Sequence, residues 1–149
     1  MNKEELLQAL KASIGRKLGR EQPHLSAWLD GTLREVSEDG FAVEFMVRPD
    51  MANPMGLFHG GAQAAIIDDV IGLTAYASDL AHRYVSINLS IDFLGAAKIG
   101  DTVLAKSRLV RQGKQILHVE CDLYDERGRL ISKGASNMFR RSTPKKEER

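Results

Sequence analysis

The stretch NPMGLFHGG (residues 53–61) runs directly into AQAAIIDDVIGL (residues 62–73). The first part is turn-prone, because it holds one proline and three glycines among nine residues. The second part has no proline and carries small or aliphatic side chains on nearly every side, a pattern that predicts a buried helix. Two adjacent acids, Asp68 and Asp69, interrupt this apolar run. A carboxylate in an apolar helix is costly unless it is paired or has a function.

The start of the predicted helix is the second unusual feature. His59-Gly60-Gly61 stands where the first helical N–H groups have no partner within the helix. Glycines at such a start allow these N–H groups to approach an anion or a polarised carbonyl closely. Together with the acids, this start marks residues 53–73 as the candidate functional stretch.

Strands are predicted on both sides of the central helix. Alternating apolar and polar residues and turn-prone sequences between them predict six strands, at about 31–37, 41–48, 84–94, 102–111, 115–124 and 129–140. An amphipathic helix is predicted at about 3–18, and the charged tail 141–149 is predicted to be disordered. We therefore expect one α+β domain, residues 1–140, in which a six-stranded antiparallel sheet wraps around one long helix.

Composition excludes several classes of protein. The formal charge of +1 over 149 residues provides no basic field, so nucleic acid is not an expected partner. The single cysteine, Cys121, excludes an internal disulfide and fits a reducing compartment. There is no signal-peptide pattern and no run of 18 apolar residues, so we expect a cytoplasmic protein without a membrane partner. No His, Asp, Glu and Cys cluster has ligand spacing, so no metal is expected.

The order of elements and the motifs resemble the hotdog fold, specifically the acyl-CoA thioesterases of the phenylacetate-degradation (PaaI) type. The main motif is Asn53, then His59-Gly60-Gly61, then Asp68 nine residues after His59. Segments that also look like family positions contain Ser86, Lys98, Arg111, Lys114 and Gly134. Each motif alone is weakly specific, whereas the set in this order is strongly so.

The resemblance implies a role for each of these residues. Asn53 and the Gly60 N–H would hold the thioester carbonyl, and His59 would orient the site. Asp68 of the partner chain would attack or activate water, which Ser86 would position. Substrate or coenzyme A contacts are expected at Gly61, Lys98, Arg111, Lys114 and Gly134. No cofactor is expected, since coenzyme A is part of the substrate.

The chemistry independently favours two chains. Thioester hydrolysis needs hydrogen-bond donors at the developing oxyanion and a base or nucleophile. Gly60 and Asp68 are eight residues apart, which is about 12 Å along a continuous helix. One carbonyl can hardly meet both within a subunit, so we expect a homodimer with composite sites. The family resemblance implies that dimers pair into tetramers. Asp69 competes with Asp68 for the catalytic role, and the spacing from His59 favours Asp68.

Other interpretations stay open at this point. Taken singly, Asn53 could be a turn residue, His59 a helix cap, and Asp68 a buried structural acid. The expected function is hydrolysis of an aromatic or medium-chain acyl-CoA, by a covalent or a general-base route. The alternatives are a hotdog hydratase or dehydratase, and a non-catalytic acyl-CoA-binding or regulatory protein.

Overall fold

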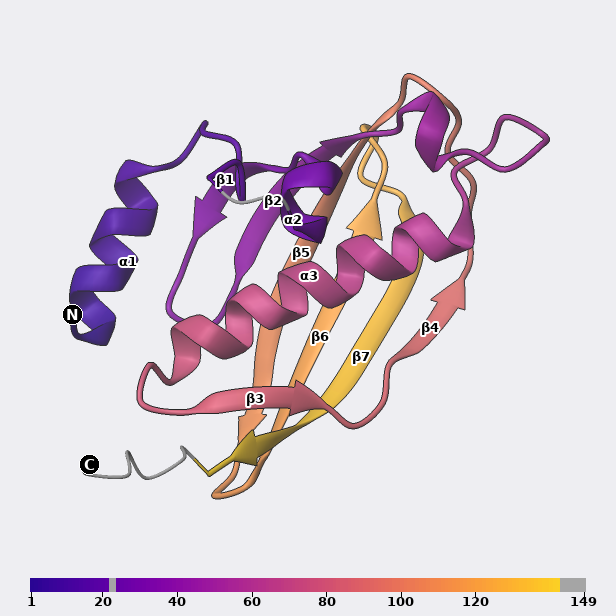
Figure 1. Ribbon diagram of the computed structural model, residues 1–149. Helices are drawn as coiled ribbons and strands as arrows, with labels where there is room; N and C mark the ends of the chain where they lie inside the picture. Colours follow the sequence, from indigo (N-terminus) through magenta and orange to yellow (C-terminus); the bar gives the residue numbers. More distant parts are fainter. Residues whose placement is uncertain (22–23, 143–149) are drawn as a thin grey trace.

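A computed structural model describes residues 1–21 and 24–142 (Figure 1). Its helices and strands, in chain order, are α1 (Lys3–Ala12), α2 (Leu25–Leu29), β1 (Thr32–Val36), β2 (Phe41–Met46), the 3₁₀ turn η1 (Pro49–Met51), α3 (Gly60–Ser78), β3 (Arg83–Ser86), β4 (Ser90–Phe93), β5 (Thr102–Gln112), β6 (Ile116–Tyr124) and β7 (Leu130–Arg141). The predicted disordered tail lies, from residue 143 onward, outside the described residues.

The strands form one antiparallel sheet in the order β1-β2-β5-β6-β7-β3, and β4 also pairs with β7. The sheet curls around α3, which crosses its concave face (Figure 1). The expected hotdog architecture is confirmed. It follows from one long apolar helix that only a curved sheet can cover, and from strands that short hairpin turns join to one another.

The strand expected at 84–94 is two strands, β3 and β4. Between β3 and β4 a side chain takes the place of regular backbone pairing with β7, because Asn88 Oδ1 accepts the Asn137 N–H at 2.9 Å. Ser136 Oγ in turn donates to the Asn88 carbonyl at 2.8 Å. Side-chain hydrogen bonds of this kind compete with regular strand pairing, so the predicted strand is interrupted at Asn88.

The N-terminal helix is shorter than the predicted range 3–18. A capping box formed by Asn2 and Glu5 starts α1, but Gly15 has a φ of +88° and its N–H bonds to the Leu33 carbonyl at 2.7 Å. Leu18 likewise donates to the Gly31 carbonyl at 2.8 Å. The residues after α1 therefore run beside β1. Helix α2 lies between the predicted N-terminal helix and the first predicted strand, where the sequence pattern indicated neither a helix nor a strand.

Helix α3 supplies much of the core. Ile66, Ile67 and Ile71 are fully buried, and burying such a side chain contributes about 1.5–3 kcal/mol. The opposite face is more open than an all-apolar helix predicts, with Gly61 and Asp68 exposed and Ala65 half-buried. The sheet thus covers only one side of α3. None of the helices among the described residues has the length and hydrophobicity needed to cross a membrane.

Candidate active site

The start of α3 has free backbone donors. His59 caps the helix, since its Nδ1 accepts the Gly61 N–H at 2.8 Å. The neutral imidazole therefore carries its proton on Nε2. The Gly60 N–H, by contrast, has no acceptor among the described residues. Gly61 is required for the cap, because a Cβ there would lie 2.9 Å from His59 Nδ1. The structure thus uses the Gly61 N–H internally and leaves those of Gly60 and Ala62 without an acceptor among the described residues.

Backbone and side-chain hydrogen bonds fix the turn before α3. Asn53 Oδ1 accepts the N–H groups of Met55 at 3.0 Å and Leu57 at 3.1 Å. Its carboxamide is thereby oriented, and the NH₂ group has no acceptor in the described part of the chain. Buried Gln63, which the sequence did not single out, donates to the Phe58 carbonyl at 3.1 Å. This bond ties the turn to the first turn of α3.

Asp68 and Ser86 come together from α3 and β3. Ser86 Oγ lies 3.5 Å from Asp68 Oδ1, a long hydrogen bond between exposed side chains. Both line a cavity of about 640 Å³ between α3, β3 and the segment that precedes β1. A carboxylate beside a hydroxyl in an open cavity can hold and activate a water molecule. The two residues, which the resemblance grouped from separate motifs, are therefore neighbours in space.

Asp69 lines the same cavity but has a different environment. Ser26 Oγ, from α2, donates to its Oδ1 at 2.5 Å. Burial raises the pKa of Asp69, partly offset by the Ser26 hydrogen bond and by nearby His24. The Ser26 contact had no signal in the sequence, because it joins segments 43 residues apart. Asp69 is thus held by α2, whereas Asp68 is open to the cavity.

Helix α3 is continuous from Gly60 to Ser78. Gly60 and Asp68 are therefore separated by about 12 Å along the axis, at ~1.5 Å per residue. The Gly60 N–H and the Asp68–Ser86 pair do not form one compact site within a single chain. The phenyl ring of Phe93 instead lies against Gly60, 3.2 Å from where a Cβ would be.

The basic candidates are not gathered in one place. Lys98 lies beside the turn before α3, bridged to Leu57. Arg111 and Lys114 line a separate depression of about 750 Å³ at the β5–β6 hairpin. Strand β5 separates the two places by about 33 Å at ~3.3 Å per residue. One coenzyme A molecule therefore cannot meet all three cations within a chain.

Close packing between β7 and α3 explains the glycine at position 134. It is buried in β7, where a Cβ would lie 2.6 Å from Ile67 Cγ2 on α3 and 3.1 Å from the Cys121 carbonyl. The residue lets helix and sheet approach closely. Its expected contact with coenzyme A stays a prediction. Among the described residues no three His, Cys, Asp or Glu side chains are grouped as metal ligands would be.

Residues 55–132 match the sequence model of a family described as the Thioesterase superfamily. Among curated proteins, acyl-coenzyme A thioesterase 13 from Mus musculus is 26% identical over 104 residues, covering 69% of this chain and 74% of that protein.

Solved structures show the same fold. Thioesterase superfamily member 2 from zebra fish has a TM-score of 0.75 at 21% identity, covering 93% of this chain and 98% of that chain. The E. coli PaaI protein from the phenylacetic acid degradation operon has a TM-score of 0.76 at 20% identity, covering 82% of this chain and 87% of that one.

Proposed function

The chain belongs to the thioesterase superfamily, and from this premise we propose that it hydrolyses an acyl-CoA to the free acid and coenzyme A. The substrate class follows the name of the mouse relative, an acyl-coenzyme A thioesterase. Within this class we propose an aromatic or medium-chain acyl group. A carboxylate and amide donors provide the base and the oxyanion contacts, so we propose that no metal or cofactor takes part.

One observation carries the proposal: the Asp68–Ser86 pair in an open cavity on the helix that begins with an unpaired Gly60 N–H. We assign to Asp68 the role of base or nucleophile, and to Ser86 the positioning of water. The Gly60 N–H, with the positive end of the helix dipole behind it, would stabilise the oxyanion.

The distance along α3 supports a homodimer with composite sites. A second α3 lying antiparallel would place its Gly60 beside Asp68 of the first chain. The open face of α3 and the free edge of β3 are suitable surfaces, since β3 pairs only with β7 among the described strands. Val85 and Ile87, which are 43% and 58% exposed, would be covered there. Pairing of dimers into a tetramer stays a prediction, which light scattering after gel filtration would measure.

The remaining residues have supporting roles. Asn53, whose carbonyl oxygen is held by the turn, would direct its NH₂ group to the thioester oxygen. His59 would orient the site by capping α3. For the phosphates of coenzyme A, the paired cations Arg111 and Lys114 are the stronger candidates, because Arg and Lys suit phosphate oxygens and both line one depression.

Release of free thiol from a panel of acyl-CoAs tests the proposal. The panel comprises acetyl, hexanoyl, palmitoyl, benzoyl and phenylacetyl esters, with wild type, Asp68→Asn and Asp69→Asn. We expect kcat to fall by about 100-fold or more for Asp68→Asn, as for loss of a general base, and by far less for Asp69→Asn.

Three outcomes would contradict parts of this proposal. Wild type that releases no thiol but binds acyl-CoA would indicate a binding protein. Conversion of an enoyl-CoA, offered beside the panel, without thiol release would indicate a hydratase. A larger loss for Asp69→Asn than for Asp68→Asn would transfer the catalytic role to Asp69.

A further inference from the structure

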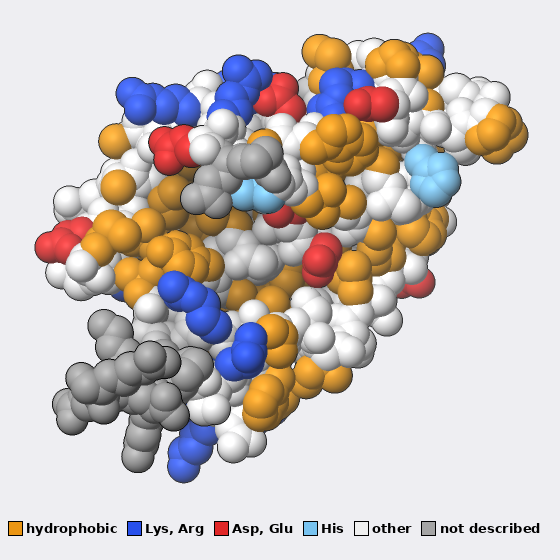
Figure 2. Space-filling model, viewed as in Figure 1, with side chains coloured by type: hydrophobic (Ala, Val, Ile, Leu, Met, Phe, Trp, Pro, Cys, Tyr) orange, Lys and Arg blue, Asp and Glu red, His pale blue; other side chains and the backbone are white. Residues whose placement is uncertain are grey.

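The surface around the start of α3 carries few cations on its visible face. On the right of the view in Figure 2, where α3 begins, this surface is mostly orange and white, and the blue Lys and Arg side chains of the view lie farther off. A cation can stabilise an oxyanion over a range of positions, whereas an N–H does so only when it is well aligned. The direction of the Gly60 N–H therefore decides how strongly it stabilises a developing oxyanion.

Gln63 holds two consecutive peptide groups at this start. Its side-chain Nε2 donates to the Phe58 carbonyl at 3.1 Å, and its backbone N–H donates to the His59 carbonyl at 3.0 Å. The His59 carbonyl and the Gly60 N–H belong to one trans peptide group, so they point in opposite directions. Fixing this carbonyl therefore helps to fix the direction of the free N–H.

The preceding peptide group is held at both ends. The Phe58 carbonyl accepts the side chain of Gln63, and the His59 N–H donates to the Met51 carbonyl at 2.9 Å. Without the side chain of Gln63, this peptide group would keep only its N–H contact and would be freer to rotate about the backbone bonds beside it. Such a rotation would turn the next peptide group as well, and the Gly60 N–H with it.

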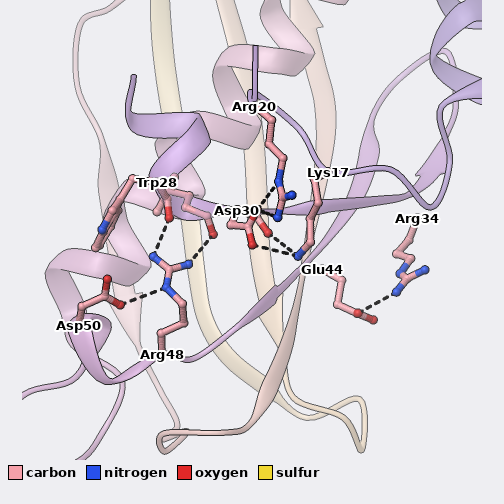
Figure 3. Close-up of polar contacts among 9 residues, drawn as sticks. Lys17, Arg20, Trp28, Asp30, Arg34, Glu44, Arg48 and Asp50 are labelled. Atoms are coloured by element: carbon pink, nitrogen blue, oxygen red, sulfur yellow. Dashed lines mark hydrogen bonds and ion pairs between the residues drawn. The ribbon is translucent and has the colours of Figure 1, made fainter. Parts of the chain in front are cut away.

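The Met51 carbonyl that accepts the His59 N–H is itself anchored. The Met51 N–H donates to the Arg48 carbonyl at 3.0 Å, which closes the turn η1. The Arg48 side chain in turn donates to the carbonyl groups of Trp28 at 2.6 Å and Leu29 at 3.2 Å in α2 (Figure 3). This anchor does not depend on α3, so Gln63 provides the separate link between the turn and the helix.

The side chain of Gln63 is unusual for its place in the helix. The residue is only 4% exposed, and it is the fourth residue of α3, where an apolar side chain often packs against the residue before the cap. Here that residue is Phe58. A carbonyl can only accept, so the side-chain NH₂ group faces it, and Oε1 has no partner among the described residues. A buried acceptor without a partner is unfavourable, so stability alone does not explain the glutamine.

We propose that Gln63 is a positioning residue for catalysis: by holding the Phe58 carbonyl, its side chain aligns the Gly60 N–H without touching the substrate. The proposal rests on the function proposed above, which assigns stabilisation of the oxyanion to that N–H. It gives a reason for burying a half-bonded amide at a position where an apolar side chain would pack.

Gln63→Met tests the proposal, since it removes the amide at nearly constant volume. Misalignment of the donor should lower kcat for acyl-CoA hydrolysis by about 10- to 100-fold. KM should change by less than about threefold, because Gln63 does not contact the substrate. Tm should fall little, because the unbonded Oε1 is removed together with the bond to Phe58. A folded Gln63→Met protein with the wild-type kcat overturns the proposal while the thioesterase function stands.

Thr74→Val is the matched control. It also replaces a buried polar side chain of α3 by an apolar one, and it removes bonds to the Val70 carbonyl at 2.9 Å and to Ser107 Oγ at 2.6 Å. Thr74 is 14 residues after Gly60, about 21 Å along the helix. The variant should lower Tm at least as much as Gln63→Met and leave kcat unchanged. An equal loss of kcat in both variants would show that any loosening of α3 has this effect, and would overturn the proposal.

A double-mutant cycle with Gly60→Pro identifies the group through which Gln63 acts. Proline at position 60 has no N–H to align. Gln63→Met should therefore lower kcat no further in the Gly60→Pro background. The same loss of kcat in both backgrounds would show that Gln63 acts on another part of the site, which contradicts the proposal.

Binding of two non-hydrolysable probes separates this proposal from the proposed function. The first is a ketone analogue of hexanoyl-CoA, in which CH₂ replaces the thioester sulfur, and the second is the hexyl-CoA thioether, which has no carbonyl. Gln63→Met should raise the Kd of the ketone about fivefold, as for loss of one hydrogen bond, and leave that of the thioether unchanged.

The outcomes of the binding experiment are distinct. Wild type that hydrolyses no ester but shows this difference between the probes removes the proposed function and supports alignment of the Gly60 N–H by Gln63. Equal changes for both probes, or no change for either, overturn the alignment. Wild type that binds neither probe overturns both proposals.

Discussion

If Gly60 and Asp68 act on one thioester from two different chains, two inactive variants should restore each other's activity when mixed. The first variant is Asp68→Asn. The second is Gly60→Pro, which removes the free N–H and adds the proline ring. Proline is favoured at the first helical position, Gly60 does not have a positive φ, and His59 has the φ of −64° and ψ of 133° that a residue before proline adopts.

The structure determines the expected magnitudes. Losing one oxyanion donor should lower kcat by about 100- to 1,000-fold. Gly60→Ala is the matched control, because it keeps the N–H and adds the same Cβ beside the exposed ring of Phe93, 3.2 Å away. It should retain most of the activity, which would assign the loss in Gly60→Pro to the missing N–H.

The assay is thiol release after equal amounts of the two inactive variants have exchanged subunits. Random exchange makes half of the dimers hybrid, and each hybrid has one complete site of two. Activity should therefore recover to about a quarter of the wild-type value. Native mass spectrometry would measure the exchange. Hybrids that form without any recovery would show that the site is built within a single chain, and the argument from the length of α3 would be wrong.

Three further predictions concern stability and are tested by thermal or denaturant unfolding. Burial raises the pKa of Asp69, so ionisation of this carboxyl group destabilises the folded protein as pH rises through the raised pKa. The variant Asp69→Asn cannot ionise and keeps an acceptor for Ser26, so its Tm at pH 8 should be higher than that of wild type. This difference in Tm should vanish below pH ~4, where Asp69 is protonated in the folded and the unfolded protein. A lower Tm at pH 8 would show that the Ser26 bond to the carboxylate outweighs burial. Gly134→Ala should lower the free energy of unfolding by about 1–3 kcal/mol by overpacking, because its Cβ would meet Ile67 Cγ2 at 2.6 Å. Adding Ile67→Leu, which removes this β-methyl group at nearly constant volume, should recover part of the loss, and no recovery would place the strain elsewhere. Arg48→Ala should lower the free energy of unfolding by about 1.5–3 kcal/mol, because the hydrogen bonds to the carbonyl groups of Trp28 and Leu29 are lost. It should also speed amide hydrogen exchange in α2. Unchanged exchange in α2 would contradict the anchoring role of Arg48.

The elements that sequence predicted well are those governed by periodic hydrophobicity. The central helix and the order of the strands follow from apolar runs that only one arrangement can bury together. Helix α1 was overextended because Ile14 and Leu18 continue the helical spacing, whereas Gly15 turns the chain toward β1. The split between β3 and β4 was missed because it depends on Asn88 and a partner strand 49 residues away.

Some features of the candidate site could likewise be predicted from the sequence, and others could not. The positions of Gly60, Asp68 and Ser86 could be expected from motifs, and the structure places Asp68 beside Ser86. The Ser26–Asp69 contact could not be expected, since it depends on how a loop with no periodic pattern folds back onto α3. The spacing of Gly60 and Asp68 along α3 was the one quantity from which the sequence alone predicted a dimer.

The segment between Leu18 and Gly31 leaves the sheet and returns to it at nearly one point. The Leu18 N–H bonds to the Gly31 carbonyl at 2.8 Å, and Lys17 Nζ bonds to the Asp30 carbonyl at 2.9 Å. The two ends of this segment are therefore held close together, and each doubling of a loop with joined ends costs only about 0.6 kcal/mol. Changes in the length of the segment between residues 18 and 31 should therefore alter the stability of the sheet very little.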